Sequence, residues 1–539
     1  MITTSPVPWR FRLGGSGTKD LLRFALRRER FTLPWWLLGT AALLVLQSSS
    51  SQQLYDTPEK LAALRETIGA NAATTAMSGP TELLATIGGE ILWEVFGYMA
   101  IVVALMNMFL IGRHTRSDEE AGRAELIRSA RVGRRAPAFA ALALAGLADC
   151  AVILVVFGAA LATGLPAGGS FLAAVALAAV GAAFAAVTSV AAQVFENPRS
   201  VYGSVVLLLT AAYLLRAMGD VGNPAMSWLS PIGWAQRTYP YVSDRWWPVL
   251  LLLAVTAVLT GVAFVLLDRR DFGAGLLPYR AGPPNASALL SSALGLAWRL
   301  QRGALAAWCV GVFVLGLAYG SLADSIEDFL ADNPGFAAYL PGGTADAVDS
   351  FLALTLSLAA LLAAAYGING ALRARSEETG GRAEPLLAAP VGRGRWLMSH
   401  AAIAYTGSAA VLLAGGLGEG LAHGLTVGDA GEGLRAAGAA LTYLPAVWLI
   451  VAVAVLGFGW APRAAAVLSW TALGYCAVAL LFAESFDLPA WFGNASPFEH
   501  TPQAPLESPA AAPLLVILGL AVLMSATGVL GFRRRDTGY

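Results

Sequence analysis

Two stretches of charged residues, 259 positions apart, repeat one pattern of Glu, Gly and Arg. Residues 116–134 read RSDEEAGRAELIRSARVGR and residues 375–393 read RSEETGGRAEPLLAAPVGR, so 11 of 19 positions are identical without a gap. Around Glu119, Arg123 and Glu125, opposite charges three and four residues apart favour a short helix. A loop that needs only positive charge has no reason to keep Glu and Gly in both copies. We therefore expect both stretches to dock a partner protein through charge pairs.

No arrangement of side chains predicts a catalytic site. The segment GGSGTKD at 14–20 resembles a phosphate-binding loop, but that loop needs Gly directly before Lys and Ser or Thr after it. Here Thr18 precedes Lys19 and Asp20 follows it. The four histidines lack metal-ligand spacing, and no nucleophile is paired with a base. We expect no enzyme activity, no metal and no cofactor in this chain.

The composition indicates a membrane protein. Apolar residues make up 57% of the chain and charged residues only 13%, about half the charged share of soluble domains. Mean hydropathy is +0.63. A membrane helix needs about 20 mostly apolar residues. Twelve stretches qualify, namely 32–50, 91–112, 137–163, 171–193, 201–217, 247–267, 304–322, 350–372, 396–422, 436–458, 464–483 and 511–532. The fifth and the eleventh are the weakest, which leaves ten spans as the alternative.

The positions of Lys and Arg predict that both termini are cytoplasmic, since basic residues collect on that side. The 35 basic residues then fall mostly in the inner segments, and the outer loop at 323–349 is acidic. The outer loops hold only Lys60, Arg65, Arg216, Arg237, Arg245 and Arg435. A net charge of +0 gives no reason to expect nucleic-acid binding.

The repeat extends over the whole chain. Arg269-Arg270-Asp271, for example, matches Arg534-Arg535-Asp536. Each half contains six predicted spans, and an even number gives both halves the same orientation. The expected fold is an all-α polytopic membrane protein, with twelve transmembrane helices as two parallel six-helix repeats. Its parts are a cytoplasmic N-terminus with an interfacial helix over 1–30, the first repeat over 31–270, a cytoplasmic linker with an interfacial helix (286–302) over 271–303, and the second repeat over 304–539.

Polar residues inside spans are candidates for a substrate pathway, because burial in lipid without a partner is costly. Asp149 lies near the middle of a span, and Asn107 and Asn369 lie in two others. For Asp149, a pathway role and a structural hydrogen bond are equally open. Glu90 and Glu94 are expected to face water at the outer mouth.

The charged stretches, together with LSPIGWAQRTYPY at 229–241 and SPFEHTP at 496–502, resemble permease subunits of actinobacterial ABC exporters. The resemblance covers nearly the whole chain and is closest to the ABC-2 class, polyketide-antibiotic and tetronasin-resistance type. It implies a multi-pass permease in the lipid of the bacterial inner (plasma) membrane. This permease would export small apolar or amphipathic compounds such as antibiotics, powered by two copies of a soluble ABC ATPase that carries ATP and Mg.

The resemblance also assigns residues to ATPase coupling. They are Glu119, Gly122, Arg123, Glu125, Gly133 and Arg134 in the first copy, and Glu378, Gly381, Arg382, Glu384, Gly392 and Arg393 in the second. Pro385 is predicted to interrupt a helix in the second copy, which would make the two docking sites unequal. Segments 218–246 and 484–510 are assigned to an outer cap of short helices.

A proton-coupled secondary drug transporter of the major-facilitator type is the alternative, because it also has two six-span halves and basic loops after spans two and eight. The loop order G-x-x-x-D-R-x-G-R-R typical of that type is absent here, and the first outer loop, 51–90, is long for it. A third interpretation is a membrane sensor that transports nothing.

Overall fold

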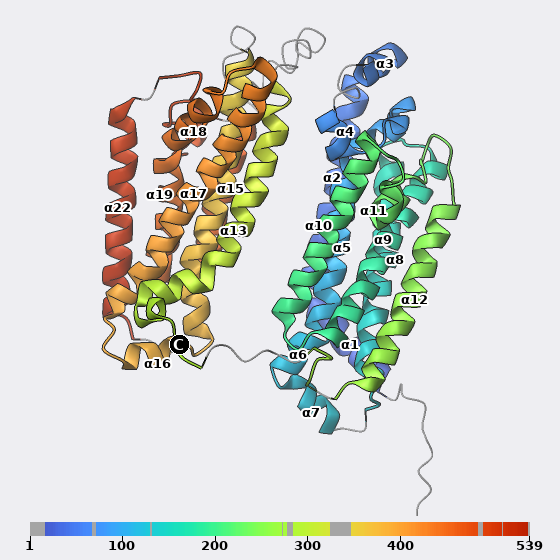
Figure 1. Ribbon diagram of the computed structural model, residues 1–539, viewed down its shortest axis with the longest axis horizontal. Coiled ribbons are helices and arrows are strands. Elements are labelled where there is room, and N and C mark those ends of the chain that lie inside the picture. The colour runs from blue at the N-terminus through green and yellow to red at the C-terminus, as the bar shows by residue number, and fades with distance from the viewer. Residues whose placement is uncertain are drawn as a thin grey trace, which may run out of the picture. The chain divides into compact units, whose positions relative to one another are not determined.

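Helices make up most of the computed structural model, which divides into two units, Met1–Gly282 and Pro283–Tyr539 (Figure 1). The described residues are 17–55, 57–66, 72–129, 132–271, 273–277, 284–323, 347–482, 489–508 and 510–536. Over these ranges there is no β-sheet, although Phe195 and Leu277 form an isolated bridge. Both units are therefore helical throughout their described parts.

The first unit consists of long apolar helices joined by short ones. In chain order these are α1 Thr18–Glu29, α2 Thr32–Leu54, α3 Pro58–Glu66, α4 Ala72–Ser78, the 3-10 helix η2 Thr81–Ala85, α5 Ile87–Arg113, α6 Arg116–Glu120, α7 Arg123–Ser129, α8 Ala136–Ala162, α9 Ala167–Val194, α10 Pro198–Val221, η3 Ser227–Leu229, α11 Pro231–Gln236 and α12 Trp247–Arg269. The most apolar stretches of α5 and α9 are 72% and 78% buried, against 17% for α12, so α5 and α9 form the centre. The many Ala and Gly residues of α9 let its neighbours approach closely.

The second unit is built in the same way. Its helices are η4 Ala288–Ser291, α13 Ala293–Gly320, α15 Ala347–Thr379, α16 Ala383–Ala388, α17 Arg393–Val427, α18 Glu432–Thr442, α19 Leu444–Trp460, α20 Ala465–Phe482, α21 Ala490–Asn494 and α22 Ala511–Arg534. Here α15 is central, with 78% of its apolar stretch buried. Gly316 and Gly320 of α13 lie so close to α17 that a side chain would meet the backbone oxygens of Gly415 and Glu419. Only glycine permits this approach.

Where the structure describes them, the predicted spans fall on helices, although 436–458 is divided between α18 and α19. Nine of the described helices are long and apolar enough to cross a membrane, or up to eleven if two bent pairs count as one span each. The pairs are α1 with α2, bent by 63°, and α18 with α19, bent by 43°. Pro445 at the start of α19 explains the second bend, since proline cannot continue a preceding helix. The helix at 465–481 is shorter than a full span.

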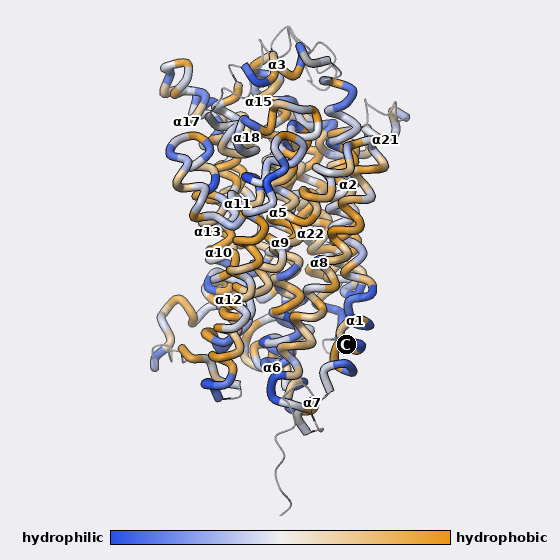
Figure 2. The backbone as a smooth tube through the Cα atoms, turned by 90° about the vertical axis from the view of Figure 1, so that its right-hand side faces the viewer, coloured by the Kyte–Doolittle hydropathy of each residue, from blue (hydrophilic) through white to orange (hydrophobic). Residues whose placement is uncertain are grey.

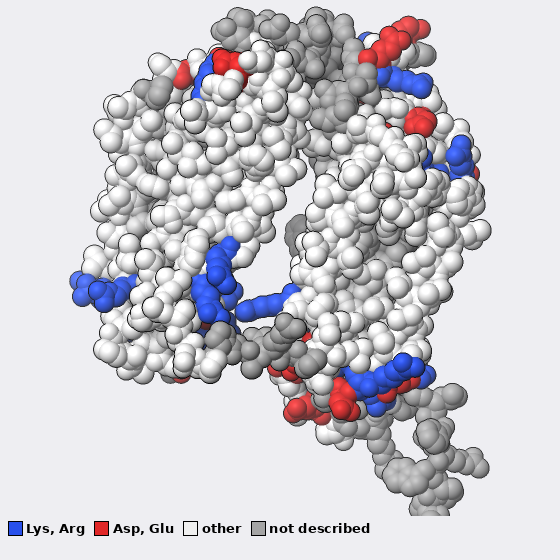
Figure 3. Space-filling view, viewed as in Figure 1, with Lys and Arg blue, Asp and Glu red and all other residues white. Residues whose placement is uncertain are grey.

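Polarity follows the helix axes. Figure 2 shows apolar residues along the middle of the long helices and hydrophilic residues towards their ends. On the visible face of each unit, charged side chains lie towards the two ends, and a largely uncharged band separates them (Figure 3). This is the pattern of helices that cross a hydrocarbon layer, and the chain is a multi-pass membrane protein.

The two predicted interfacial helices differ from each other. In the first unit α1 is a separate amphipathic helix, set off from α2 by the 63° bend. In the second unit the segment 286–302 contains only the short η4, and residues from Ala293 onward are already part of α13. A separate helix at 286–302 is therefore not what the structure shows.

Short helices occupy the described parts of the predicted caps. Residues 218–246 contain η3 and α11, and residues 484–510 contain α21. The acidic loop at 323–349 lies almost entirely outside the described residues.

Candidate functional site

One glycine shapes each charged motif. Gly122 and Gly381, at equivalent positions, have φ of +70° and +69°, a conformation that favours glycine. The first motif therefore folds as two helices, α6 and α7, and the second as the end of α15 followed by α16. The single short helix predicted around Glu119–Glu125 was wrong, because helix-compatible charges do not reveal a left-handed glycine.

The arginine after each glycine folds back on its own motif. Arg123 binds the Asp118 carboxylate at 2.8 Å, and Arg382 binds the Glu377 carboxylate at 2.8 Å. Asp118 and Glu377 occupy the same position in the repeat. Each pair spans the glycine turn, so these arginines stabilise the shape of the motif.

The Glu of each motif ties it to the end of its unit's last long helix. Glu119 accepts two hydrogen bonds from Arg270, at 2.6 and 3.1 Å, and Glu378 accepts two from Arg535, at 2.9 and 2.8 Å. Arg270 follows α12 and Arg535 follows α22. Sequence reasoning did not assign these arginines to the site, although the matching Arg-Arg-Asp segments were a usable signal.

A second arginine caps the same helix end. Arg134 donates to the carbonyl oxygens of Leu267 and Arg270, at 2.9 and 2.5 Å, and Arg393 donates to that of Arg535, at 2.7 Å. The last carbonyl groups of a helix have no partner within it, so a guanidinium there is favourable. Gly133 and Gly392 directly precede the two capping arginines. We name this arrangement, Glu119–Arg270–Arg134 and Glu378–Arg535–Arg393, the helix-end clamp.

The first clamp is the more deeply buried. Arg116, fully buried, adds a 2.8 Å ion pair to Glu119 and donates to the Ala192 carbonyl. Arg270 also donates to Gln193 at 2.7 Å. The network around Glu378 is simpler. The side chain of Arg375, which matches Arg116, donates to the Arg463 carbonyl on the surface and forms no ion pair with Glu378. The two motifs are unequal, but not through Pro385. That residue is third in α16, where the missing N–H has no helical partner to lose.

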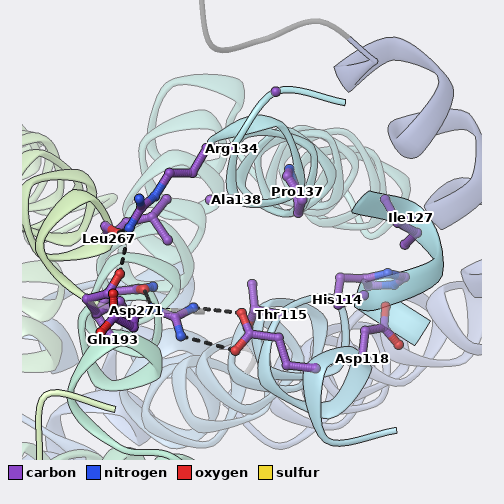
Figure 4. A pocket seen from close by; sticks show the side chains of 14 residues that line it. His114, Thr115, Asp118, Ile127, Arg134, Pro137, Ala138, Gln193, Leu267 and Asp271 are labelled. Carbon is purple, nitrogen blue, oxygen red and sulfur yellow. Dashed lines mark hydrogen bonds and ion pairs between the residues drawn. The ribbon is translucent and has the colours of Figure 1, made fainter. Parts of the chain in front are cut away.

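A pocket lies beside the first clamp (Figure 4). His114 and Asp118 line one side of it, and Arg134 and Leu267 line the other. Ala124, Ile127 and Pro137 add apolar surface. Arg135, next to the pocket, pairs with Asp268, and this carboxylate raises the pKa of the guanidinium.

The N-terminal helix α1 is joined to this region. Glu29, at its end, is 1% exposed and binds Arg113 at 2.7 Å and His114 at 3.0 Å. Arg28 binds Asp118 at 2.9 Å. Sequence reasoning missed Glu29, since one Glu in a basic segment gives no distinctive pattern.

Two of the predicted coupling carboxylates form no ion pair among the described residues. Glu125 on α7 and Glu384 on α16 are exposed, and neither has a salt bridge within the described residues. Leu126, next to Glu125, is 75% exposed. Within the described residues, these side chains therefore stay available at the surface of each motif.

The three predicted pathway residues belong to different units, two to the first and one to the second. Asp149 and Asn107 meet in the first unit, where the Asn107 side-chain amide donates to Asp149 at 2.8 Å and both residues are buried. Asn369 belongs to the second unit, where it is exposed on α15. Glu90 is fully buried, so its predicted contact with water was wrong, and Glu94 is half-buried. Sequence reasoning did not pair Glu419 with Thr355, which donates to it at 2.5 Å.

Known proteins match nearly the whole chain. The family described as "Multidrug efflux system permease Rv1217c, C-terminal domain" matches residues 19–267 and 290–533, one stretch in each unit. The multidrug efflux system permease protein Rv1217c of Mycobacterium tuberculosis is 41% identical over 529 residues, which cover 97% of this chain and 96% of that protein. The chain belongs to this family of multidrug efflux system permeases.

Proposed function

We propose that the chain is the membrane-spanning permease of an ATP-driven ABC exporter in the bacterial inner membrane. It moves small apolar or amphipathic compounds, including antibiotics, out of the cell. Two copies of a soluble ABC ATPase, carrying ATP and Mg, supply the energy. The proposed topology has twelve spans as two parallel six-helix repeats, with both termini cytoplasmic. The name of the relative supports a multidrug efflux role, and the resemblance to polyketide-antibiotic and tetronasin-resistance permeases supports ABC-2 coupling.

The observation that carries the proposal is the helix-end clamp present in both units. A motif that only fixed topology would need arginines alone. In both copies, Glu and Arg instead join the motif to the last long helix of the unit. A force applied to the motif therefore acts directly on a membrane-spanning helix. Coupling through such contiguous contacts is the property that a partner-driven permease requires.

The helix-end clamp also indicates which side chains of the motif can contact the ATPase, because it engages others within the unit. Glu119, Arg123 and Arg134 are engaged within the unit, so reversing their charge would disturb the motif itself. Glu125 and Glu384 are exposed and offer negative charge to a partner. We therefore assign the first contact with the ATPase to these two residues.

Binding to the proposed soluble ABC ATPase tests this assignment. The double variant Glu125→Arg with Glu384→Arg should bind it about tenfold or more weakly, because like charges facing each other in an interface are strongly unfavourable. The matched control is Glu66→Arg with Glu499→Arg, two exposed acids, one in each unit and outside the motifs. Equal binding by both double variants would exclude the motifs as the docking site.

The energy source is tested separately. Drug efflux from cells should stop when the phosphate-loop lysine of the ATPase is replaced, and should persist for a time when a protonophore removes the proton gradient. If the efflux rate is unchanged by the ATPase variant but falls to zero with the protonophore, proton-coupled transport of the major-facilitator type would be favoured.

A further inference from the structure

An apolar groove runs along the second unit between α17, α19 and α22. Its walls include Met398, Trp448, Leu518, Val522 and Val529. Of these, Met398 and Val522 reach the surface, at 44% and 62% exposed, as does Leu530, another lining residue, at 47%. The groove is therefore open along the side of two candidate membrane-spanning helices, α17 and α22.

The polar groups in the groove are already satisfied. The hydroxyl groups of Tyr405 and Ser525 hydrogen-bond each other at 2.5 Å, and the Trp448 indole N–H donates to the Tyr405 carbonyl at 3.1 Å. An occupant of this part finds only methyl, thioether and aromatic surface. Its complementary portion must be apolar.

A basic pocket continues the groove at one end. It is lined by Gly394, Arg395 and Arg533, and shares Met398 and Val529 with the groove. Arg395 and Arg533 are exposed, and neither pairs with an acid within the described residues. Gly394 leaves room for the Arg533 stem, whose Cδ would lie 3.4 Å from an added side chain. Two guanidinium groups without an acidic partner among the described residues therefore lie at one end of the apolar groove.

The length of the combined site matches one leaflet of a bilayer. From Leu518 to Arg533 the helix α22 advances 15 residues, or about 22 Å at about 1.5 Å per residue. One leaflet with its headgroups measures roughly 20 to 22 Å. The cations then lie at headgroup depth and the apolar walls at acyl-chain depth.

We propose that this groove binds an anionic phospholipid, with its phosphate at Arg395 and Arg533 and an acyl chain along α22. Basic pockets between membrane helices recognise anionic headgroups in this way. At the offset of 259 that relates the two charged motifs, Tyr405 matches Gly146, so the first unit lacks a counterpart of the Tyr405–Ser525 pair. The proposal does not depend on ATP coupling.

Native mass spectrometry of the full chain in a nonionic detergent tests the site, with dioleoyl phosphatidylglycerol as the anionic probe and dioleoyl phosphatidylcholine as the neutral one. The anionic lipid should bind the wild-type chain more tightly. Arg395→Gln with Arg533→Gln should weaken its binding about thirtyfold, because each guanidinium near a membrane surface contributes about fivefold. Replacement of both by Lys should largely restore binding.

The matched control is Arg463→Gln with Arg534→Gln, two exposed arginines of the same unit that do not line the groove. It should bind like the wild type, and an equal loss would mean that surface charge alone explains the effect.

Ala526→Trp, which fills the exposed groove wall, should weaken the binding of both lipids, and unchanged binding would show that no acyl chain lies there. Displacement by inorganic phosphate would indicate a simple anion site, and displacement by an exported drug would indicate a cargo site. Either result would overturn the lipid assignment.

Discussion

At the scale of single residues, burial decides what a polar group in a span does, and burial is where sequence and structure disagree most. Asp149 was identified from sequence as an acid within an apolar run. Its partner Asn107 is 42 positions away and could not be paired with it by spacing. Glu90 looked like a water-facing residue because it begins a span, yet it is fully buried. Such side-chain environments depend on neighbouring helices and not on local sequence.

Gly181 is expected to be essential to the Asp149–Asn107 pair. A methyl group there would lie 2.5 Å from the Asp149 carboxylate and 2.6 Å from the Asn107 amide. Gly181→Ala should therefore force the two residues apart and lower the melting temperature of the purified protein by several degrees, as a lost buried hydrogen bond of about 1 to 3 kcal/mol predicts. Gly146→Ala is the control, since nothing lies within 4 Å of its added methyl. Equal melting temperatures for the two variants would contradict the close approach.

Asp149→Asn distinguishes the two roles left open for Asp149. Asparagine keeps the oxygen that the Asn107 amide uses, and its own amide can donate to the unpaired Asn107 oxygen. We expect efflux and melting temperature to stay near wild type in this variant, whereas Asp149→Leu loses stability. If Asp149→Asn folds normally but no longer exports drug, the carboxylate belongs to the substrate pathway instead.

At the scale of helices, apolar length is a local property, and for this reason the predicted spans coincide with helices. The breaks within helices were harder to predict. Pro445 was a visible signal for the break between α18 and α19, but Gly122 and Gly381 sit among residues that favour helix. Their left-handed conformation follows from the ion pairs that fold each motif back, Arg123 with Asp118 and Arg382 with Glu377. The matching Arg-Arg-Asp segments pointed to Arg270 and Arg535, but spacing could not pair these arginines with Glu119 and Glu378, which lie 151 and 157 positions away.

The two clamps should respond differently to loss of their Glu. Within the described residues, Glu119 forms ion pairs with both Arg116 and Arg270, whose side chains are 0% and 5% exposed, whereas Glu378 pairs with Arg535, which is 17% exposed. Glu119→Gln removes the carboxylate that two buried guanidinium groups share and should cost about 3 to 5 kcal/mol. Glu378→Gln should cost about 1 kcal/mol, as for a partly exposed pair. Thermal unfolding of the two variants side by side measures the difference. A larger loss for Glu378→Gln would show that the second clamp is the stronger one.

At the scale of the whole molecule, the structure divides into two units, and the charged motif occurs once in each. In each unit the charged motif and the short cap helices occupy opposite ends, as α6 and α11 do in the first unit (Figure 1). The described helices allow nine to eleven spans by length and composition. The orientation of both units in the membrane therefore rests on the distribution of basic residues, and it can be measured directly.

Cysteine labelling from the two sides of the membrane tests whether both units face the same way. In a chain with Cys150, Cys309 and Cys476 replaced by Ala, cysteines introduced at Glu125 and Glu384 should react with an impermeant maleimide only after the membrane is opened. Cysteines at Ser243 and Glu499, in the two caps, should react on intact cells. All four positions are exposed, so a missing reaction reports the side of the membrane and not burial. With an even number of spans per repeat, the two motifs must share a side. Reaction of Glu125→Cys and Glu384→Cys from opposite sides would mean an odd number of spans between them, and a single partner compartment could not drive both halves.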